Sequence, residues 1–144
     1  DLEVEDGMVM QGLFTWRSGY DAAARLLDQP DPPTAIFASN DDMAAAVVSV
    51  AHRRHLDVPA DLSVCGFDDT AFASSIWPEL TTIRQPIAEM ARRAVDLLAS
   101  EVRGGRAGKS AKPTHVTLDY TLVRRQSDAA PGLARRVRRR PEKR

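Results

Sequence analysis

Short apolar runs alternate with longer stretches of helical periodicity, and this alternation constrains the fold more than any other feature. Three runs are short enough for strands and are bounded by polar or proline residues: 34–38, 62–67 and 81–84. Three longer stretches place apolar side chains three and four residues apart, as one helix face does: 20–27, 43–54 and 86–103. This order predicts an α/β fold, with a mostly parallel sheet and helices on both of its faces.

The two ends of the chain carry less regular patterns. Residues 4–13 are apolar with interspersed acids and glycine, which predicts a strand. Residues 115–123 alternate apolar and polar side chains, and this period of two predicts a strand with one exposed face. From Ser127 onwards we expect disorder. We therefore divide the chain into a folded part, 1–126, and a basic tail, 127–144.

The formal net charge of zero hides an asymmetry between the body and the tail. Residues 1–123 contain 18 acidic and 11 basic side chains, whereas residues 124–144 contain 2 and 9. An acidic body is a poor nonspecific binder of nucleic acid, because phosphates repel it. The basic tail could contact phosphates, but a solvated, disordered terminus is the interpretation that we favour.

Composition excludes several classes of protein. The 144 residues contain one cysteine, so no disulfide framework can form within the chain, and a reducing compartment is expected. No apolar run approaches the roughly 18–20 residues of a membrane helix. The opening residues DLEVEDGMVM have neither the basic nor the apolar region of a signal peptide. These features predict a cytoplasmic protein with no membrane partner.

Polar side chains follow each of the three central predicted strands: Asn40-Asp41, Asp68-Asp69 and Arg84-Gln85. In open α/β sheets ligands bind at the carboxyl ends of the strands, where such side chains can converge on one cleft. Carboxylates and amides suit a polyhydroxylated ligand, on whose apolar face an aromatic ring can pack. The aromatic candidates are Phe14, Trp16 and Phe72. The alternative is that the first group only caps the next helix and the second only forms a turn.

The sequence carries few signs of catalysis or metal binding. It has no nucleophile elbow, no phosphate-binding glycine loop and no dinucleotide fingerprint. His52 and His55 lie at a predicted helix end and are expected to face solvent, while His115 has no His or Cys at metal-ligand spacing. Cys65 lies within a predicted strand and is expected to be a small buried side chain. We therefore expect no enzymatic activity, no cofactor and no metal.

Several segments taken together resemble the effector-binding domain of the LacI/GalR (lac repressor) family of transcriptional regulators. They follow the family's order and spacing over about residues 10–128: FTWRSGYDAAARLL, PTAIFASNDDMAAAVV, HLDVPADLSVCGFDDTAFAS, PELTTIRQPIAEMARRAVDLL and VTLDYTLVRRQS. The resemblance implies a periplasmic-binding-protein-like fold of type I, in which two similar α/β subdomains flank a cleft. Effector binding in that cleft shifts the subdomains and changes the affinity for operator DNA.

The resemblance also implies which residues bind the effector. Asn40 in FASND is expected to contact the ligand with its amide, and Asp68 in GFDD to accept hydrogen bonds from sugar hydroxyls. Gln85 in TTIRQP is expected to face the cleft, Phe14 to pack on the ligand, and Ile87 to contact it as well. Three neighbouring residues are expected at the rim or in a turn: Asp69, Thr70 and Ser74.

The match covers only part of the family pattern, because a helix-turn-helix, a hinge and an amino-terminal subdomain have no counterpart in these residues. We therefore expect one incomplete subdomain, the effector-sensing part of a DNA-binding regulator. Its partners would be a small-molecule effector, expected to be a carbohydrate, and a second copy in a homodimer. Operator DNA would be bound only through the missing amino-terminal domain. The alternative is a stand-alone sugar-binding protein of the periplasmic type.

The resemblance has one consequence for stability. In the family fold the helix at 86–103 packs on the missing subdomain, so its apolar stripe would lack a cover. At about 25 cal/mol per Å² of apolar surface, an exposed stripe forfeits several kcal/mol. We expect the isolated chain to be marginally stable, to self-associate, or to release this helix.

Overall fold

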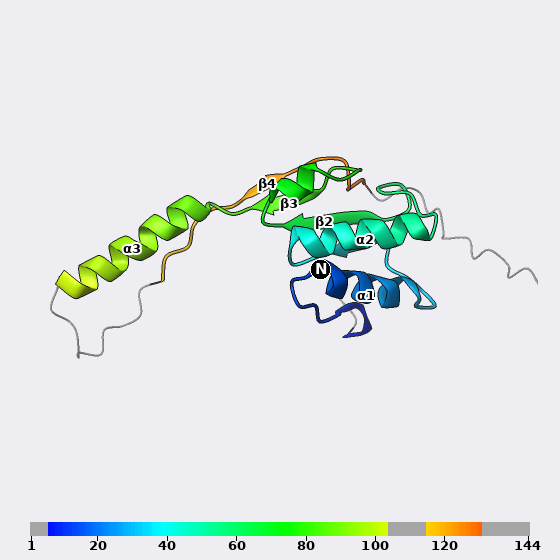
Figure 1. The fold of residues 1–144 in the computed structure, drawn as a ribbon, viewed down its shortest axis with the longest axis horizontal. Helices are drawn as coiled ribbons and strands as arrows, with labels where there is room; N and C mark the ends of the chain where they lie inside the picture. The colour runs from blue at the N-terminus through cyan, green and yellow to red at the C-terminus, as the bar shows by residue number, and fades with distance from the viewer. Residues whose placement is uncertain (1–5, 104–114, 131–144) are drawn as a thin grey trace, which may run out of the picture.

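The computed structural model describes residues 6–103 and 115–130, which form a four-stranded sheet with helices (Figure 1). The strands follow one another across the sheet in chain order: β1 (Ala35–Phe37), β2 (Ser63–Phe67), β3 (Thr81–Arg84) and β4 (Thr121–Val123). The first three strands are parallel, and β4 runs antiparallel to β3. The predicted mixed α/β fold with a mostly parallel sheet is therefore confirmed.

The body of the fold has three layers, namely the sheet, α2 (Asp41–Arg53) and α1 (Trp16–Leu27) (Figure 1). The middle layer, α2, is buried on nearly all sides because the sheet covers one face of it and α1 the other. Small residues allow the layers to approach closely. A Cβ at Gly66 of β2 would lie 3.2 Å from the Cβ of Ala44, and one at Gly19 of α1 would lie 2.6 Å from the Cα of Met43.

Helix boundaries follow from local chemistry. Thr15 and Ser18 form a capping box at the start of α1, and the Asn40 side chain caps α2. A proline-rich segment after α1 prevents its continuation. The third helix, α3 (Ile87–Arg103), begins directly after Pro86, and two short 3-10 helices complete the described chain: η1 (Asp6–Met8) and η2 (Ala71–Ser74).

Within the described residues both packed helices lie on the same side of the sheet, which corrects the expectation that helices cover both faces. The physical reason is the handedness of the connections. Parallel strands added in one direction by right-handed crossovers place every connection on the same face. The strand order β1-β2-β3 adds strands in one direction only, so α2 and η2 lie on one side.

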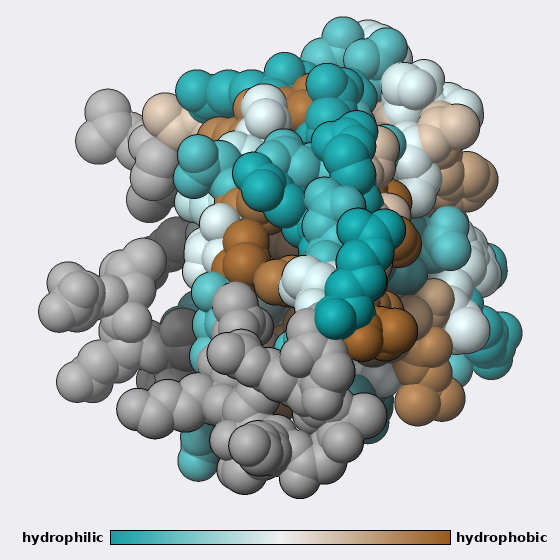
Figure 2. Space-filling view, turned by 90° about the vertical axis from the view of Figure 1, so that its left-hand side faces the viewer, coloured by the Kyte–Doolittle hydropathy of each residue, from teal (hydrophilic) through white to brown (hydrophobic). Residues whose placement is uncertain are grey.

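The opposite face of the sheet is apolar and open. Phe37 on β1 and Leu122 on β4 are exposed, and Ile83 on β3 is half-buried between Leu122 and Phe67. Cys65 shares this face and is half-buried, not fully buried as expected from its place in an apolar strand. Figure 2 views the molecule from the end at which α3 lies, and it shows brown apolar residues at the surface next to teal polar ones.

The long helix α3 projects away from the body (Figure 1) and contains no buried residue. Its apolar side chains are exposed or half-buried along the whole helix, from Ile87 through Met90 to Leu98. Residues 6–103 and 115–130 thus leave the apolar stripe of this helix uncovered, as the resemblance implied. The expected marginal stability and self-association remain predictions.

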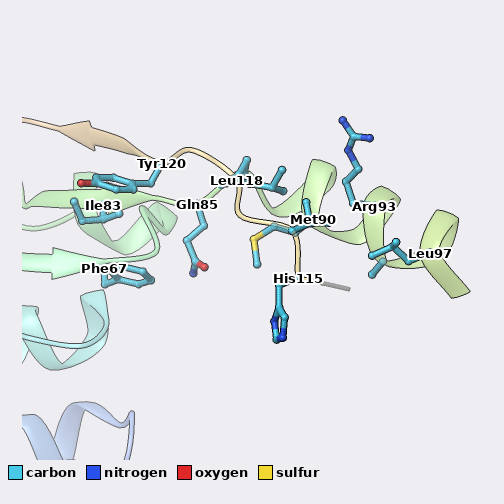
Figure 3. Close-up of a pocket in the computed structure, with 12 residues that line it drawn as sticks. Phe67, Ile83, Gln85, Met90, Arg93, Leu97, His115, Leu118 and Tyr120 are labelled. Atoms are coloured by element: carbon cyan, nitrogen blue, oxygen red, sulfur yellow. The ribbon is translucent and has the colours of Figure 1, made fainter. Parts of the chain in front are cut away.

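Two predictions at the ends of the chain require correction. The strand expected at 4–13 is wrong for the residues from Asp6 onwards, where the chain forms η1 instead, and residues 1–5 lie outside the described part. Of the strand expected at 115–123, only Thr121–Val123 pairs with β3. Residues 115–120 run alongside α3 instead, where the described part of the chain offers them no neighbouring strand (Figure 3).

The chain after β4 returns to the body instead of leaving it at Ser127. The Ser127 hydroxyl donates to the Val64 carbonyl oxygen at 2.6 Å and accepts from the Thr81 amide at 2.8 Å, and the residue is completely buried. Asp128 accepts a 2.6 Å hydrogen bond from the Thr81 hydroxyl. This packing corrects the boundary expected at Ser127, while the rest of the expected tail, 131–144, lies outside the described residues.

One pair of matched substitutions tests the unequal packing of the fold. Leu62→Ala, at a side chain that is 1% exposed, should reduce the free energy of unfolding by about 2–5 kcal/mol. Leu98→Ala, on α3 and 63% exposed, should change it by less than about 0.5 kcal/mol. Urea denaturation measures both values. Equal losses would show that α3 is packed as firmly as the core.

Candidate functional site

The loops that follow β1, β2 and β3 lie at one edge of the sheet because these strands are parallel. This arrangement brings Asp68, which follows β2, next to Gln85, which follows β3. The Gln85 side-chain amide donates a 2.7 Å hydrogen bond to Asp68 Oδ1. Among the described residues Asp68 Oδ2 has no partner, so the pair presents a free acceptor beside an amide that both donates and accepts.

The backbone at this position is strained. Asp68 has φ of 107° and Asp69 has φ of 54°, both in the region that favours glycine. Non-glycine residues in such conformations cost about 1–3 kcal/mol each and persist only where the surroundings hold them. A backbone hydrogen bond from the Asp68 amide to the Ile83 carbonyl oxygen, at 2.8 Å, fixes the first of them.

A buried carboxylate, Asp41, anchors the same loop from below. Its Oδ2 accepts from the Thr70 amide at 2.7 Å and from the Thr70 hydroxyl at 3.1 Å, and its Oδ1 accepts from the Thr82 hydroxyl at 2.6 Å. The residue is completely buried at the start of α2, where the helix dipole favours a negative charge. Asp41 thus joins α2, the loop after β2 and the middle of β3.

Asn40 uses both ends of its side chain within the fold. Its Oδ1 accepts from the Met43 amide at 2.9 Å as the cap of α2, and its Nδ2 donates to the Phe14 carbonyl oxygen at 3.0 Å. Phe14 has φ of 56°, and its ring is exposed. Asn40 therefore caps α2 and also holds the backbone that carries the Phe14 ring, while its contact with a ligand remains a prediction.

Asp69 forms two ion pairs that the sequence did not predict. Arg125 Nη2 lies 2.6 Å from its Oδ1 and Arg84 Nε lies 2.5 Å from its Oδ2. The carboxylate is nearly buried, with a side chain that is 6% exposed. Asp69 therefore lies in the turn after β2, one of the two places expected for it, with its side chain directed into the interior of the loop.

Three pKa values depart from their ordinary range. Burial opposes ionisation of Asp69, but hydrogen bonds and charges from Arg125 and Arg84 outweigh it and lower the pKa of that carboxyl. A hydrogen bond from Thr81, assisted by Arg124, lowers the pKa of Asp128 despite its burial. Burial raises the pKa of the Cys65 thiol, which disfavours the reactive thiolate at neutral pH.

An open groove of about 720 Å³ lies between α3 and the segment 115–120 (Figure 3). Gln85 projects into it from one end, between Phe67 and Ile83 of the sheet and Met90 of α3. Of the five predicted effector-binding residues, Gln85 alone lines this groove, whose other walls are largely apolar. The groove therefore follows the uncovered side of α3 and extends away from Asp68, Asn40 and Phe14.

Comparison with known proteins gives a family for this fold. The chain matches the model of the periplasmic binding protein-like domain over residues 1–127. It belongs to that family. The HTH-type transcriptional repressor CytR of Escherichia coli K12 is 39% identical over 129 residues, which are 90% of this chain and 37% of the repressor. The ribose operon repressor of the same strain is 40% identical over 101 residues, 70% of this chain and 31% of that protein.

Solved structures agree with this assignment. A complex of the transcriptional regulator CelR with cellobiose superposes with a TM-score of 0.78 and 33% identity, covering 88% of this chain and 37% of that one. These comparisons confirm the resemblance to the effector-binding domain of LacI/GalR regulators. The curated relatives named above are transcriptional repressors and not enzymes, and this chain spans about a third of their length.

Within this fold, four of the five predicted effector residues take part in two hydrogen-bonded pairs, and the fifth lies apart from them. Asp68 pairs with Gln85, and Asn40 with the Phe14 backbone. Ile87 is the exposed first residue of α3, and its amide donates to the Gln85 carbonyl oxygen at 2.9 Å. The ligand-binding roles of all five residues remain predictions.

Sequence reasoning missed the residues that hold the site in place. Thr82 and Arg125 lie 41 and 56 positions from the aspartates that they bind, so local spacing carries no sign of either contact. A threonine pair within an otherwise buried strand was the one available signal, because a buried hydroxyl requires a partner.

Neither a metal-ligand cluster nor a membrane-spanning helix is present among the described residues. No three His, Cys, Asp or Glu side chains in the ranges 6–103 and 115–130 gather as ligands for a metal ion. None of the described helices has the length and apolar character needed to cross a bilayer.

The anchoring role of Asp41 can be tested against its neighbour. Asp41→Asn replaces a buried charged acceptor of three hydrogen bonds and should lower the free energy of unfolding by about 1.5–3 kcal/mol. Asp42→Asn, at the exposed next position, should cost less than about 1 kcal/mol. Urea denaturation of both variants gives the comparison. A loss at Asp42 as large as that at Asp41 would contradict the role of the buried network.

The lowered pKa values of Asp69 and Asp128 predict a specific dependence of stability on acid. Their stabilising contribution is complete above the ordinary value of 3.8 and is lost as the pH falls below it, through the lowered pKa. The urea midpoint of the chain should therefore decrease between about pH 4 and pH 2. Asp128→Asn should show a smaller decrease relative to its own midpoint at neutral pH. An identical pH profile in that variant would contradict the assignment.

Proposed function

We propose that this chain is the effector-sensing part of a LacI-type, DNA-binding transcriptional regulator. The observation that carries the proposal is the Asp68–Gln85 pair at the carboxyl ends of β2 and β3, where ligands bind in open α/β folds. The similarity to repressors such as CytR supports the regulatory role. Because the chain spans about a third of these relatives, the activity belongs to a larger protein of which these residues would form one part.

The effector that fits this site is a carbohydrate or a similar polyhydroxylated molecule. Asp68 Oδ2 would accept from a hydroxyl, and the Gln85 amide would bind an adjacent hydroxyl. The exposed Phe14 ring would pack on the apolar face of the sugar, with Asn40 holding its backbone and Ile87 adding an apolar contact. The cellobiose in the CelR complex is an example of such a ligand on a similar fold.

The remaining partners follow from the same proposal. Operator DNA would be bound through segments outside these residues, and the regulator would act as a homodimer in the cytoplasm, where its operator is found. Effector binding would change operator affinity by a coupling free energy of about 1–3 kcal/mol, which is typical of such linkage. No enzymatic step is proposed, since sensing requires only binding.

A stand-alone sugar-binding protein is the second candidate function, because the same cleft would suit transport. The two candidates differ in their response to DNA. A regulator binds an operator fragment, and its affinity for that fragment changes when the sugar is added. An electrophoretic mobility-shift assay measures this change. A transport-type protein binds the sugar with no DNA complex at all. The test uses the native gene product that contains these residues.

The role of Asp68 gives the sharpest test of the proposed function. Asp68→Ala removes the proposed acceptor and should abolish the effector response while leaving operator binding intact. Asp21→Ala, which removes an exposed carboxylate paired with Arg17 on α1, is the matched control and should leave both intact. Operator affinity with and without sugar is measured by fluorescence anisotropy. A full effector response in Asp68→Ala would refute the site.

A further inference from the structure

Asp69 lies next to the proposed ligand carboxylate, yet both of its oxygens are committed within the chain. Oδ1 accepts from Arg125 Nη2 at 2.6 Å and Oδ2 from Arg84 Nε at 2.5 Å. Its side chain is 6% exposed, so a ligand has little access to it. The two adjacent aspartates therefore have different environments, because within the described ranges Asp68 Oδ2 has no partner, whereas both oxygens of Asp69 are paired.

Arg125 provides the fixed end of this arrangement. Its side chain is 16% exposed, its Nη1 donates to the Leu80 carbonyl oxygen at 2.7 Å, and its backbone amide donates to the Thr81 hydroxyl at 2.8 Å. These contacts tie the guanidinium to the start of β3. Glu79 adds a longer ion pair at 3.8 Å. Arg125 therefore holds Asp69 from a position that is itself restrained.

Arg84 links the same carboxylate to the other end of β3. It is the last residue of that strand and directly precedes Gln85, just as Asp68 directly precedes Asp69. The Asp69–Arg84 ion pair thus connects the two chain positions next to the Asp68–Gln85 hydrogen bond. Two adjacent side-chain contacts therefore join the loop after β2 to the end of β3.

We propose that Asp69 is a positioning residue that, through Arg84 and Arg125, holds Asp68 and Gln85 in hydrogen-bonding contact before the effector arrives. This inference rests on the effector site proposed above. Preorganisation of this kind improves affinity because the ligand does not have to order the loop. The positive φ values of Asp68 and Asp69 require such an external restraint. Since Arg125 and Arg84 lower the pKa of Asp69, its carboxylate stays charged at neutral pH.

The test replaces Asp69 by asparagine, which keeps the shape of the side chain and removes its charge. The first readout is the side-chain amide resonance of Gln85 in a ¹H–¹⁵N spectrum of the full chain without ligand. The Asp69→Asn variant should shift or broaden that resonance, because the amide loses its fixed contact with Asp68. A merely structural role would lower the melting temperature and leave the resonance of the folded variant in place.

The second readout is the affinity for sugar, measured by calorimetry on the native gene product with cellobiose and ribose as probes. For either sugar that the wild type binds, Asp69→Asn and Arg125→Gln should each reduce affinity about tenfold. Arg124→Gln is the matched control, since the adjacent Arg124 pairs with Asp128 and not with Asp69. It should leave both the affinity and the Gln85 resonance unchanged. Arg125→Lys keeps the charge and should restore part of the affinity.

The outcomes separate this inference from the proposed function. An unchanged Gln85 resonance in folded Asp69→Asn, or an unchanged affinity for a sugar that the wild type binds, overturns the positioning role. Asp68→Asn with full affinity would instead contradict the effector site itself. If Asp69→Asn does not fold, Arg84→Gln decides, because that arginine is 57% exposed and its loss leaves the core intact. The same shift of the Gln85 resonance is expected there, and its absence overturns the inference.

Discussion

The buried carboxylate of Asp41 is the contact on which the rest of the described fold depends. It receives hydrogen bonds from Thr70 and Thr82, so a single side chain at the start of α2 fixes both the loop after β2 and the central part of β3. The absence of a side chain at Gly66 leaves room for it beneath β2. The Asp69 ion pairs then act on a loop whose base is already held, and Asp68 and Gln85 meet above it.

Packing is distributed unequally around this centre. One face of the sheet is covered by α2, which α1 covers in turn, whereas the opposite face and the whole of α3 expose apolar side chains such as Phe37 and Leu98. The exposed helix and the groove beside Gln85 are apolar surfaces that the described residues leave open, and the chain spans only about a third of the length of its curated relatives.

Much of the fold could be predicted from the sequence because its signals are local. Runs such as 34–38 and 81–84 are bounded by breakers, and the stripes at 43–54 and 86–103 have helical spacing, so those elements were located within a few residues. The face that each helix covers was not predicted, since it depends on the direction of strand addition. Placing Asp68 beside Gln85 required only parallel strands, whereas the partners Thr82 and Arg125 come from distant positions that leave no local pattern.

We have proposed that a sugar effector binds at the Asp68–Gln85 pair at the strand ends. A ¹H–¹⁵N chemical-shift map of the native gene product, titrated with cellobiose and ribose, tests this directly. We expect the largest shifts at the Asp68 backbone amide and the Gln85 side-chain amide. Saturable sugar binding with no shift at either position, or with shifts confined to α3 and residues 115–120, would contradict it.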